Sequence, residues 1–211
     1  FKTATFISPT IIKTKENGTI RTTSGTYNLE TGKAFFYNRT AYSDSTRSLI
    51  GGKIAYDEKS GILQAEDNAK LVDSVNNVIV LGNQILVDKN NKTFLATRKP
   101  VMILYKDNDS TYVTADTLFS GQRKYDSSKN ELTTVQDTLT KETTINTKQS
   151  NDSIRYFLAF NHVKIFNDSL QAVCDSLYYS TQDSVFRMFR DPVFWNDKTQ
   201  VSGDTIYLFT K

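Results

Sequence analysis

The stretch Cys174-Asp175-Ser176-Leu177 contains the pattern that decides the fold of this chain. A small residue is followed three positions later by an apolar β-forming residue, and Asp-Ser or Asp-Thr often stands between them. The pattern returns in Ala115-Asp116-Thr117-Leu118 and Gly203-Asp204-Thr205-Ile206, and looser copies begin at Ser24, Gly51 and Gly82. The copies recur about every 30 residues, with one step nearly twice as long, which predicts stacked copies of one supersecondary unit.

Each copy of the motif leads into a strand, a turn and a returning strand. After Gly51, residues 53–56 and 62–66 are rich in apolar residues and enclose a turn of Asp, Ser and Gly, the residue types that chain reversal favours. We expect equivalent hairpins at 27–37, 85–96 and 177–189. No window shows a sustained 3.6-residue apolar period, so we expect little helix.

Two returning strands end at similar corners, Arg98-Lys99-Pro100 and Arg190-Asp191-Pro192, because proline cannot donate to a strand ladder. Several strands, such as Val185–Met188 and Ile206–Phe209, are apolar at successive positions. A half-buried antiparallel strand would alternate apolar and polar residues, so these strands are expected to contact a partner on both faces.

The composition excludes several kinds of site. The chain has 26 basic and 23 acidic residues, well mixed, and this weak net charge of +3 does not indicate a nucleic-acid partner. With one Cys and one His, no disulfide, multi-Cys zinc site or multi-His metal site is expected, and no cofactor either. Cys174 occupies the small-residue position of the motif, so we interpret it as a packing residue rather than a reactive thiol.

The length of 211 residues suits one continuous array, and we expect a single domain over 1–211. The chain lacks an apolar run long enough for a transmembrane helix. It begins and ends in strand-like runs, which suggests a fragment of a longer precursor. The repeat of about 30 residues is interrupted at about 120–153. This segment is either a mobile insertion or a degenerate unit with long loops, in which Asp137-Thr138-Leu139 is a faint copy of the motif. We favour the degenerate unit.

Several runs of this sequence resemble those of a known family. The run Ser169–Ser180, followed by Asp183–Met188, Pro192–Trp195 and Gly203–Ile206, is similar to the OstA/LptA family of periplasmic lipopolysaccharide-transport proteins. Within this family, the amino-acid sequence of these runs is most similar to the OstA-like proteins of Bacteroidetes. The runs Ile20–Asn28 and Tyr112–Leu118 also fit the family.

The resemblance implies an all-β open β-jellyroll, or β-taco, in which two facing sheets splay along one side of an apolar groove. It also implies a periplasmic carrier or bridge that shelters the acyl chains of lipopolysaccharide, or of another glycolipid, on the way to the outer membrane. Its expected partners are other β-jellyroll transport components or further copies of itself, joined end to end through edge strands. The family has no catalytic residues and no metal, so we expect no enzyme.

Two sets of residues are candidates for such a site. We predict that eleven residues share the inner, lipid-contacting face, although packing of a closed sandwich core is an alternative for each of them: Ile54, Tyr56, Ile85, Val87, Leu118, Leu177, Tyr179, Met188, Trp195, Ile206 and Leu208. Four cations near the proline corners are candidates for headgroup phosphates, with ordinary solvated charge as the alternative: Arg98, Lys99, Arg187 and Arg190.

Two other functions stay open. A structural β-solenoid, such as an adhesin-like segment or a protein-interaction module, would have closed, dry interiors. A carbohydrate-active β-repeat enzyme would need two carboxylates about 5–9 Å apart, and the Asp and Glu residues here lie in turns without a signature.

Overall fold

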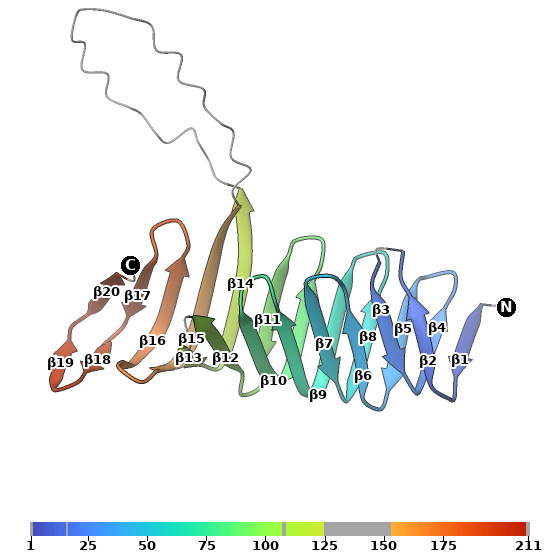
Figure 1. Cartoon of the computed structure of the whole chain (residues 1–211), viewed down its shortest axis with the longest axis horizontal. Helices are drawn as coiled ribbons and strands as arrows, with labels where there is room; N and C mark the ends of the chain where they lie inside the picture. The colour runs from blue at the N-terminus through green and yellow to red at the C-terminus, as the bar shows by residue number, and fades with distance from the viewer. Residues whose placement is uncertain (1, 16, 107–108, 125–152, 210–211) are drawn as a thin grey trace, which may run out of the picture.

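A computed structural model describes residues 2–15, 17–106, 109–124 and 153–209. These residues form antiparallel strands and contain no helix, which confirms the all-β prediction. The strands stand side by side in one long row, with the N-terminus at one end and the C-terminus at the other (Figure 1). The row is an open jellyroll built from two ladders of strands, called sheet I and sheet II here.

Sheet I contains twelve strands or parts of strands, and its neighbours pair in the order given. They are β1 (Thr3–Phe6), β4 (Ser24–Asn28), β5 (Lys33–Tyr37), β8 (Lys53–Asp57), the first part of β9 (Ile62–Asp73), the second part of β10 (Val78–Asp88), β11 (Thr93–Thr97), β14 (Thr117–Lys124), the first part of β15 (Ser153–Phe166), the second part of β16 (Gln171–Ser180), β17 (Val185–Phe189) and β20 (Thr205–Phe209).

Sheet II contains the other halves of the four long strands together with the remaining short strands. In order they are β2 (Thr10–Lys13), β3 (Thr19–Thr22), β6 (Thr40–Ser43), β7 (Arg47–Gly51), the second part of β9, the first part of β10, β12 (Val101–Lys106), β13 (Asp109–Thr114), the second part of β15, the first part of β16, β18 (Val193–Asn196) and β19 (Thr199–Ser202).

The chain crosses between the sheets at corners, and the two crossing directions use different residues. Crossings from sheet II to sheet I carry the small residue of the motif, as at Gly51, Gly82 and Ala115. Five crossings in the other direction use left-handed backbone at residues of varied type: Asn38, Asp67-Asn68, Arg98-Lys99, Asn161-His162 and Arg190-Asp191. One period of about 30 residues is therefore an out-and-back pass through both sheets.

Successive corners are joined by backbone hydrogen bonds. The amide of Gly52 donates to the carbonyl of Asp67 at 2.9 Å, and the amide of Asp116 donates to the carbonyl of Asn161 at 3.0 Å. The amide of Asn83 makes the same contact with Arg98 at 3.2 Å. These bonds hold the sheets together along the corner side of the row.

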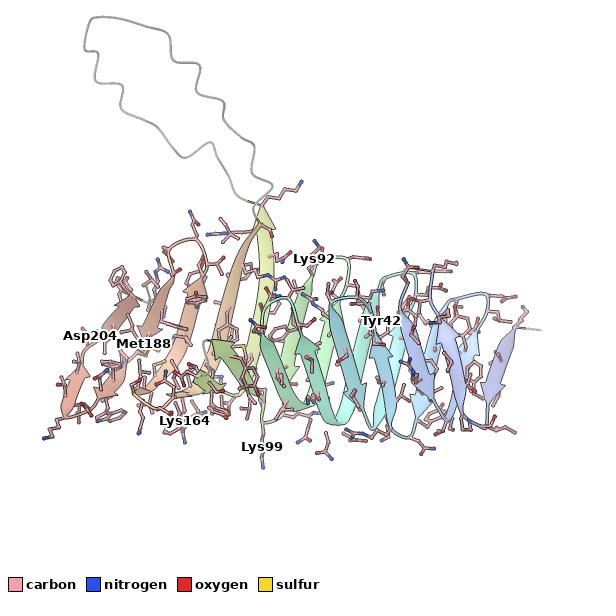
Figure 2. All side chains as sticks on the ribbon, in the orientation of Figure 1. Tyr42, Lys92, Lys99, Lys164, Met188 and Asp204 are labelled. Carbon is pink, nitrogen blue, oxygen red and sulfur yellow. The ribbon has the colours of Figure 1, made fainter. Side chains whose placement is uncertain are left out.

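The hairpin turns lie at the far ends of the strands from the corners. Lys92, in a turn of sheet I, and Lys99, in a corner, lie on opposite sides of the row (Figure 2). Asp residues close these turns, as where Asp44 Oδ1 accepts from the amides of Thr46 and Arg47, each at 2.9 Å. The hairpins predicted at 27–37, 53–66, 85–96 and 177–189 are confirmed, and all four belong to sheet I.

The core lies between the two sheets, where large and small side chains alternate along one row of sheet I. Ala65 pairs with both Ile54 and Ile85, and Ala96 pairs with both Ile85 and Leu118. The four residues of these pairs, Ala65, Ile85, Ala96 and Leu118, together with Ile54, are at most 1% exposed, so the row forms a buried, packed part of the interior on the corner side.

The long motif step between Ala115 and Cys174 spans β14 and β15, which pair directly with each other from Thr117 and Phe160 to Lys124 and Ser153. The ladder of sheet I is therefore continuous across this step. Residues 125–152, with the faint motif at Asp137, lie outside the described residues, and their interpretation as a degenerate unit stays a prediction.

Candidate functional site

Ten of the eleven predicted inner-face residues lie in two neighbouring rows on the inner face of sheet I. The row nearest the corners contains Ile54, Ile85, Leu118, Leu177, Met188 and Ile206, and the row nearest the turns contains Tyr56, Val87, Tyr179 and Leu208. The register therefore brings them together on one face. Their contact with lipid stays a prediction.

Trp195 does not belong to this face. In β18 it pairs with the exposed Gln171, whereas its neighbour Phe194 pairs with the buried Ala172. Successive residues of a strand point to opposite faces, so Phe194 is the inward residue and Trp195 points outward. The indole Nε1 of Trp195 donates to Gln200 Oε1 at 2.9 Å on that outer face.

The four predicted headgroup cations lie away from the interior. Arg98, Lys99 and Arg190 are exposed at corners, on the closed side of the molecule. Arg187 lies on the outer face of sheet I, 5.4 Å from the ring centroid of Tyr178, and forms an ion pair with Asp183. None of the four lines a pocket between the sheets, so their placement does not support headgroup binding.

A pocket of about 680 Å³ lies between the sheets, beside the turns. The sheet I wall is formed by Phe94, Ser120, Phe157, Tyr179 and Phe186, and the sheet II wall by Val78, Met102, Leu104 and Thr111. Polar side chains, among them Asp73, Asn76, Asp109, Arg155 and Asn167, form its rim. An apolar wall with a polar rim suits an amphiphilic ligand, and the volume lies within the range of small-molecule sites.

A second pocket of about 300 Å³ lies next to the first, and the two share the lining residues Asp73 and Arg155. Arg155 Nη1, from sheet I, lies 3.6 Å from Asp73 Oδ2, from sheet II, so the pair crosses the interior between the sheets. Arg47 Nε donates to the same carboxylate oxygen at 3.0 Å. This cluster of Arg47, Asp73 and Arg155 separates the two pockets and is called the ionic clasp here.

Two other contacts cross between the turns of the two sheets. Lys15 Nζ lies 3.7 Å from Glu58 Oε1, and Lys89 Nζ lies 5.3 Å from the ring centroid of Tyr42. Both lie on the N-terminal side of the clasp. The larger pocket lies on its C-terminal side, where no ion pair between the described residues crosses the interior.

Burial perturbs two ionisable groups near this interior. The pKa of the Arg155 guanidinium is lowered, chiefly by desolvation; Asp73 opposes this shift and the like charge of Arg47 adds to it. The pKa of the Cys174 thiol is raised to about 11, chiefly by desolvation. Because Cys174 is 8% exposed and holds the motif position of Gly51 and Ala115, it is a packing residue with little thiolate at neutral pH.

The sequence prediction missed the clasp. Arg47 and Asp73 are 26 residues apart, and Arg155 lies far beyond both, so no local motif joins them. The one available signal was that Arg47 follows the Asp44 turn directly and Asp73 ends the strand that pairs with it, which places both at the turn side of sheet II.

Metal sites and membrane-spanning helices are two other features that residues 2–15, 17–106, 109–124 and 153–209 could contain. No group of three or more His, Cys, Asp or Glu side chains in these parts of the chain could hold a metal ion. Over the same residues, no helix has the length and apolar character needed to span a membrane.

The similarity of this chain to known proteins lies in its architecture and not in its sequence. Neither protein-family models nor curated proteins match the sequence. Among solved structures, the chain is similar to LptH, the LptA-homologous periplasmic component of the lipopolysaccharide transport device of Pseudomonas aeruginosa. The two are 11% identical, with a TM-score of 0.47 over 78% of this chain and 95% of that chain.

Proposed function

We propose that this protein is a periplasmic carrier that shelters acyl chains of lipopolysaccharide, or of a related glycolipid, between its two sheets. The observation that carries the proposal is the larger pocket, whose inner wall is apolar and whose polar rim lies at the turn side. Phe94, Met102 and Phe157 line it and are each at most 8% exposed, so buried apolar side chains form its wall.

The energetics favour such an occupant. Each methylene of an acyl chain gains about 0.8 kcal/mol when it leaves water for an apolar site. The headgroup of a lipid stays hydrated, and a pocket beside the turns lets the headgroup remain at the polar rim while the chain enters. The sequence resemblance to the OstA/LptA family supports the same occupant.

A pocket-filling variant tests the proposal. Ser120 lies between Phe94 and Phe157 on the inner wall, so Ser120→Phe places a ring in the larger pocket. Thr117→Phe is the matched control, because Thr117 belongs to the same strand and pairs with the exposed Phe160 on the outer face. Binding of purified lipopolysaccharide, measured by displacement of a fluorescent fatty acid, is expected to fall for Ser120→Phe and to persist for Thr117→Phe.

Two results would contradict the proposal. Unchanged binding by Ser120→Phe would place the lipid elsewhere, and a wild-type protein that binds neither probe would favour a structural solenoid with a dry interior. Circular dichroism and thermal melting of each variant show whether the fold survives. Native mass spectrometry of protein purified without detergent is expected to retain a bound glycolipid.

End-to-end assembly is part of the same proposal. In the described chain, β20 pairs with β17 along one edge, and Tyr207 and Phe209 on it are 57% and 71% exposed. Such an edge is suited to β-augmentation by a second copy or by another β-jellyroll component of a transport bridge. Light scattering is expected to show association that grows with concentration, and a strict monomer at high concentration would contradict it.

A further inference from the structure

The floor of the smaller pocket is apolar, although polar and charged side chains surround its mouth. Four residues form this floor and are each at most 3% exposed: Leu49, Leu63, Leu71 and Val87. Val87 pairs directly with Phe94, which lines the larger pocket. The inner face of sheet I is therefore apolar from one pocket to the next, and its apolar character alone does not confine an acyl chain to the larger pocket.

A side chain from sheet I stands in the passage between the two pockets. Arg155 lines both pockets and reaches across the interior to Asp73 of sheet II. Beside it on sheet I lies Gln122, which, in the amide orientation that satisfies both groups, accepts from Arg155 Nε at 2.9 Å. Asp73 in turn accepts from Arg47 and from the side-chain amide of Asn76. Arg155 is thus held from both sheets at the boundary.

An acyl chain cannot replace these partners. Methylene groups neither donate nor accept hydrogen bonds, so a chain that pushed Arg155 aside would leave a guanidinium and a carboxylate poorly paired. Water could not fully compensate, because the side chain of Asp73 is only 9% exposed and that of Arg155 is 27% exposed. The contacts that hold the clasp together therefore also resist its opening by a lipid.

The mouth of the smaller pocket is bridged as well. Lys89, in a turn of sheet I, lies over the ring of Tyr42 in sheet II, and both residues line this pocket. Lys15 and Glu58 form a further bridge toward the N-terminal end of the row. On the C-terminal side of the clasp, no ion pair between the described residues crosses the interior. A chain that arrives at the turn side therefore meets bridges over the smaller pocket and an unbridged mouth over the larger one.

We propose that Arg155 and Asp73 form a stop that confines acyl chains to the larger pocket. The inference rests on the proposed function, because it assigns one boundary of the site which that function requires. With the stop in place a lipid can fill about 680 Å³, and the about 300 Å³ of the smaller pocket are excluded. The two residues therefore determine specificity, since they set an upper limit on the size of the acyl portion.

Nuclear magnetic resonance locates the chain without altering the interior. The protein is deuterated except for its labelled methyl groups, and the probe is palmitate, whose acyl protons give nuclear Overhauser effects only to methyl groups close to them. In the wild type we expect effects to Met102 and Leu104 of the larger pocket and none to Leu63 and Val87 of the smaller one.

Two variants open the stop, and a third is the control. Arg155→Ala removes the side chain that spans the interior and leaves Asp73 paired with Arg47. Asp73→Asn removes the charge that attracts both guanidinium groups. In either variant we expect palmitate to contact the methyl groups of both pockets. Arg190→Ala is the matched control, because Arg190 pairs with Asp175 at an exposed corner outside the pockets, and it is expected to keep the wild-type pattern.

The outcomes separate this inference from the proposed function. Contacts with both pockets in the wild type overturn the stop and leave the proposed function standing. Contacts confined to the larger pocket in Arg155→Ala and in Asp73→Asn also overturn it, because the boundary then does not depend on the clasp. A wild type without contacts in the larger pocket contradicts the inference and the proposed function together. If neither variant folds, the contrast between the two pockets in the wild type decides.

Discussion

Asp73 of sheet II and Arg155 of sheet I meet between the two sheets, with Oδ2 and Nη1 3.6 Å apart. Their contact divides the space between the sheets into an apolar pocket and a cationic pocket. Because Arg47 shares the same carboxylate at 3.0 Å, Asp73 holds both guanidinium groups. The clasp therefore has an asymmetric structure, and its three members are not equivalent.

The asymmetry predicts unequal effects on stability. Asp73→Ala leaves two withdrawn guanidinium groups without their carboxylate and is expected to cost about 3–5 kcal/mol. Arg155→Ala leaves Asp73 paired with Arg47 and is expected to cost clearly less, about 1–2 kcal/mol. Urea unfolding followed by circular dichroism measures both. Equal losses for the two variants would show that Asp73 does not serve both arginines.

The residues at the corners determined how much of this fold could be predicted from the sequence. The small-residue motif marks each crossing into sheet I, so the four hairpins of that sheet were predicted correctly. Five crossings into sheet II use left-handed backbone at Asn, Asp, Arg, Lys and His residues, whose side chains differ in size and charge and leave no common motif. An opposite sheet was therefore expected only from the strands that are apolar on both faces and from the family resemblance.

The same limit explains the misplaced site residues. Trp195 follows the corner at Arg190-Asp191, where left-handed backbone resets which residues face inward, and a one-residue error moves a side chain to the opposite face. Of the predicted headgroup cations, Arg98, Lys99 and Arg190 lie at corners on the side of the row away from the pockets, and Arg187 lies on the outer face of sheet I. Arg47, Asp73 and Arg155 meet only through long-range strand pairing, which one sequence does not reveal.

Adding a single methyl group at Gly51, a small-residue position of the motif, is expected to lower the stability of the fold strongly. A Cβ there would lie 2.9 Å from the carbonyl oxygen of Lys53 and 3.0 Å from the Cβ of Ala65. Gly51→Ala is expected to destabilise the fold by about 1–3 kcal/mol through overpacking. At the equivalent Gly203, the nearest atom would be the carbonyl oxygen of Thr205 at 3.9 Å, so Gly203→Ala is expected to stay within about 0.5 kcal/mol.

Chemical denaturation of the two glycine variants tests this contrast. Equal stability of both variants would mean that the small residue is not required by packing at the corner. Both variants replace glycine by alanine at the same position of the motif, and they differ only in their place along the row of strands. Gly203→Ala is therefore the appropriate control.

Cys174 is expected to resist modification in the folded protein. Burial raises the pKa of its thiol to about 11 from 9.0, so the thiolate population at pH 8 falls by about two orders of magnitude. Reaction with a thiol-specific disulfide reagent is expected to be slow in buffer and rapid in denaturant. Fast labelling of the native protein would contradict the packing role of this residue.

The hydrogen bond of Tyr27 indicates that the folded protein loses stability at alkaline pH. Its hydroxyl donates to Glu58 Oε2, and this hydrogen bond is the largest cause of the rise in the Tyr27 pKa to about 12 from 10.0. A pKa raised by folding contributes stability that is fully present below pH 10 and is lost as the pH rises through 12. Thermal melting between these pH values is expected to show this loss.

The matched variant Tyr27→Phe removes the ionisable hydroxyl and keeps the ring. It is expected to be less stable than the wild type at neutral pH and to lose less stability between pH 10 and pH 12. The same alkaline loss in both proteins would assign the pH dependence to another group.

The central claim, that lipid occupies the space between the sheets, is tested most directly by neighbouring residues of one strand. Tyr179 lines the larger pocket, with its ring centroid 4.5 Å from that of Phe186, whereas Tyr178 lies on the outer face beside Arg187. A photo-crosslinking amino acid is placed at 179 or at 178, and the protein is irradiated with lipopolysaccharide. The account predicts strong labelling from 179 and background labelling from 178, and equal labelling from the two positions would contradict it.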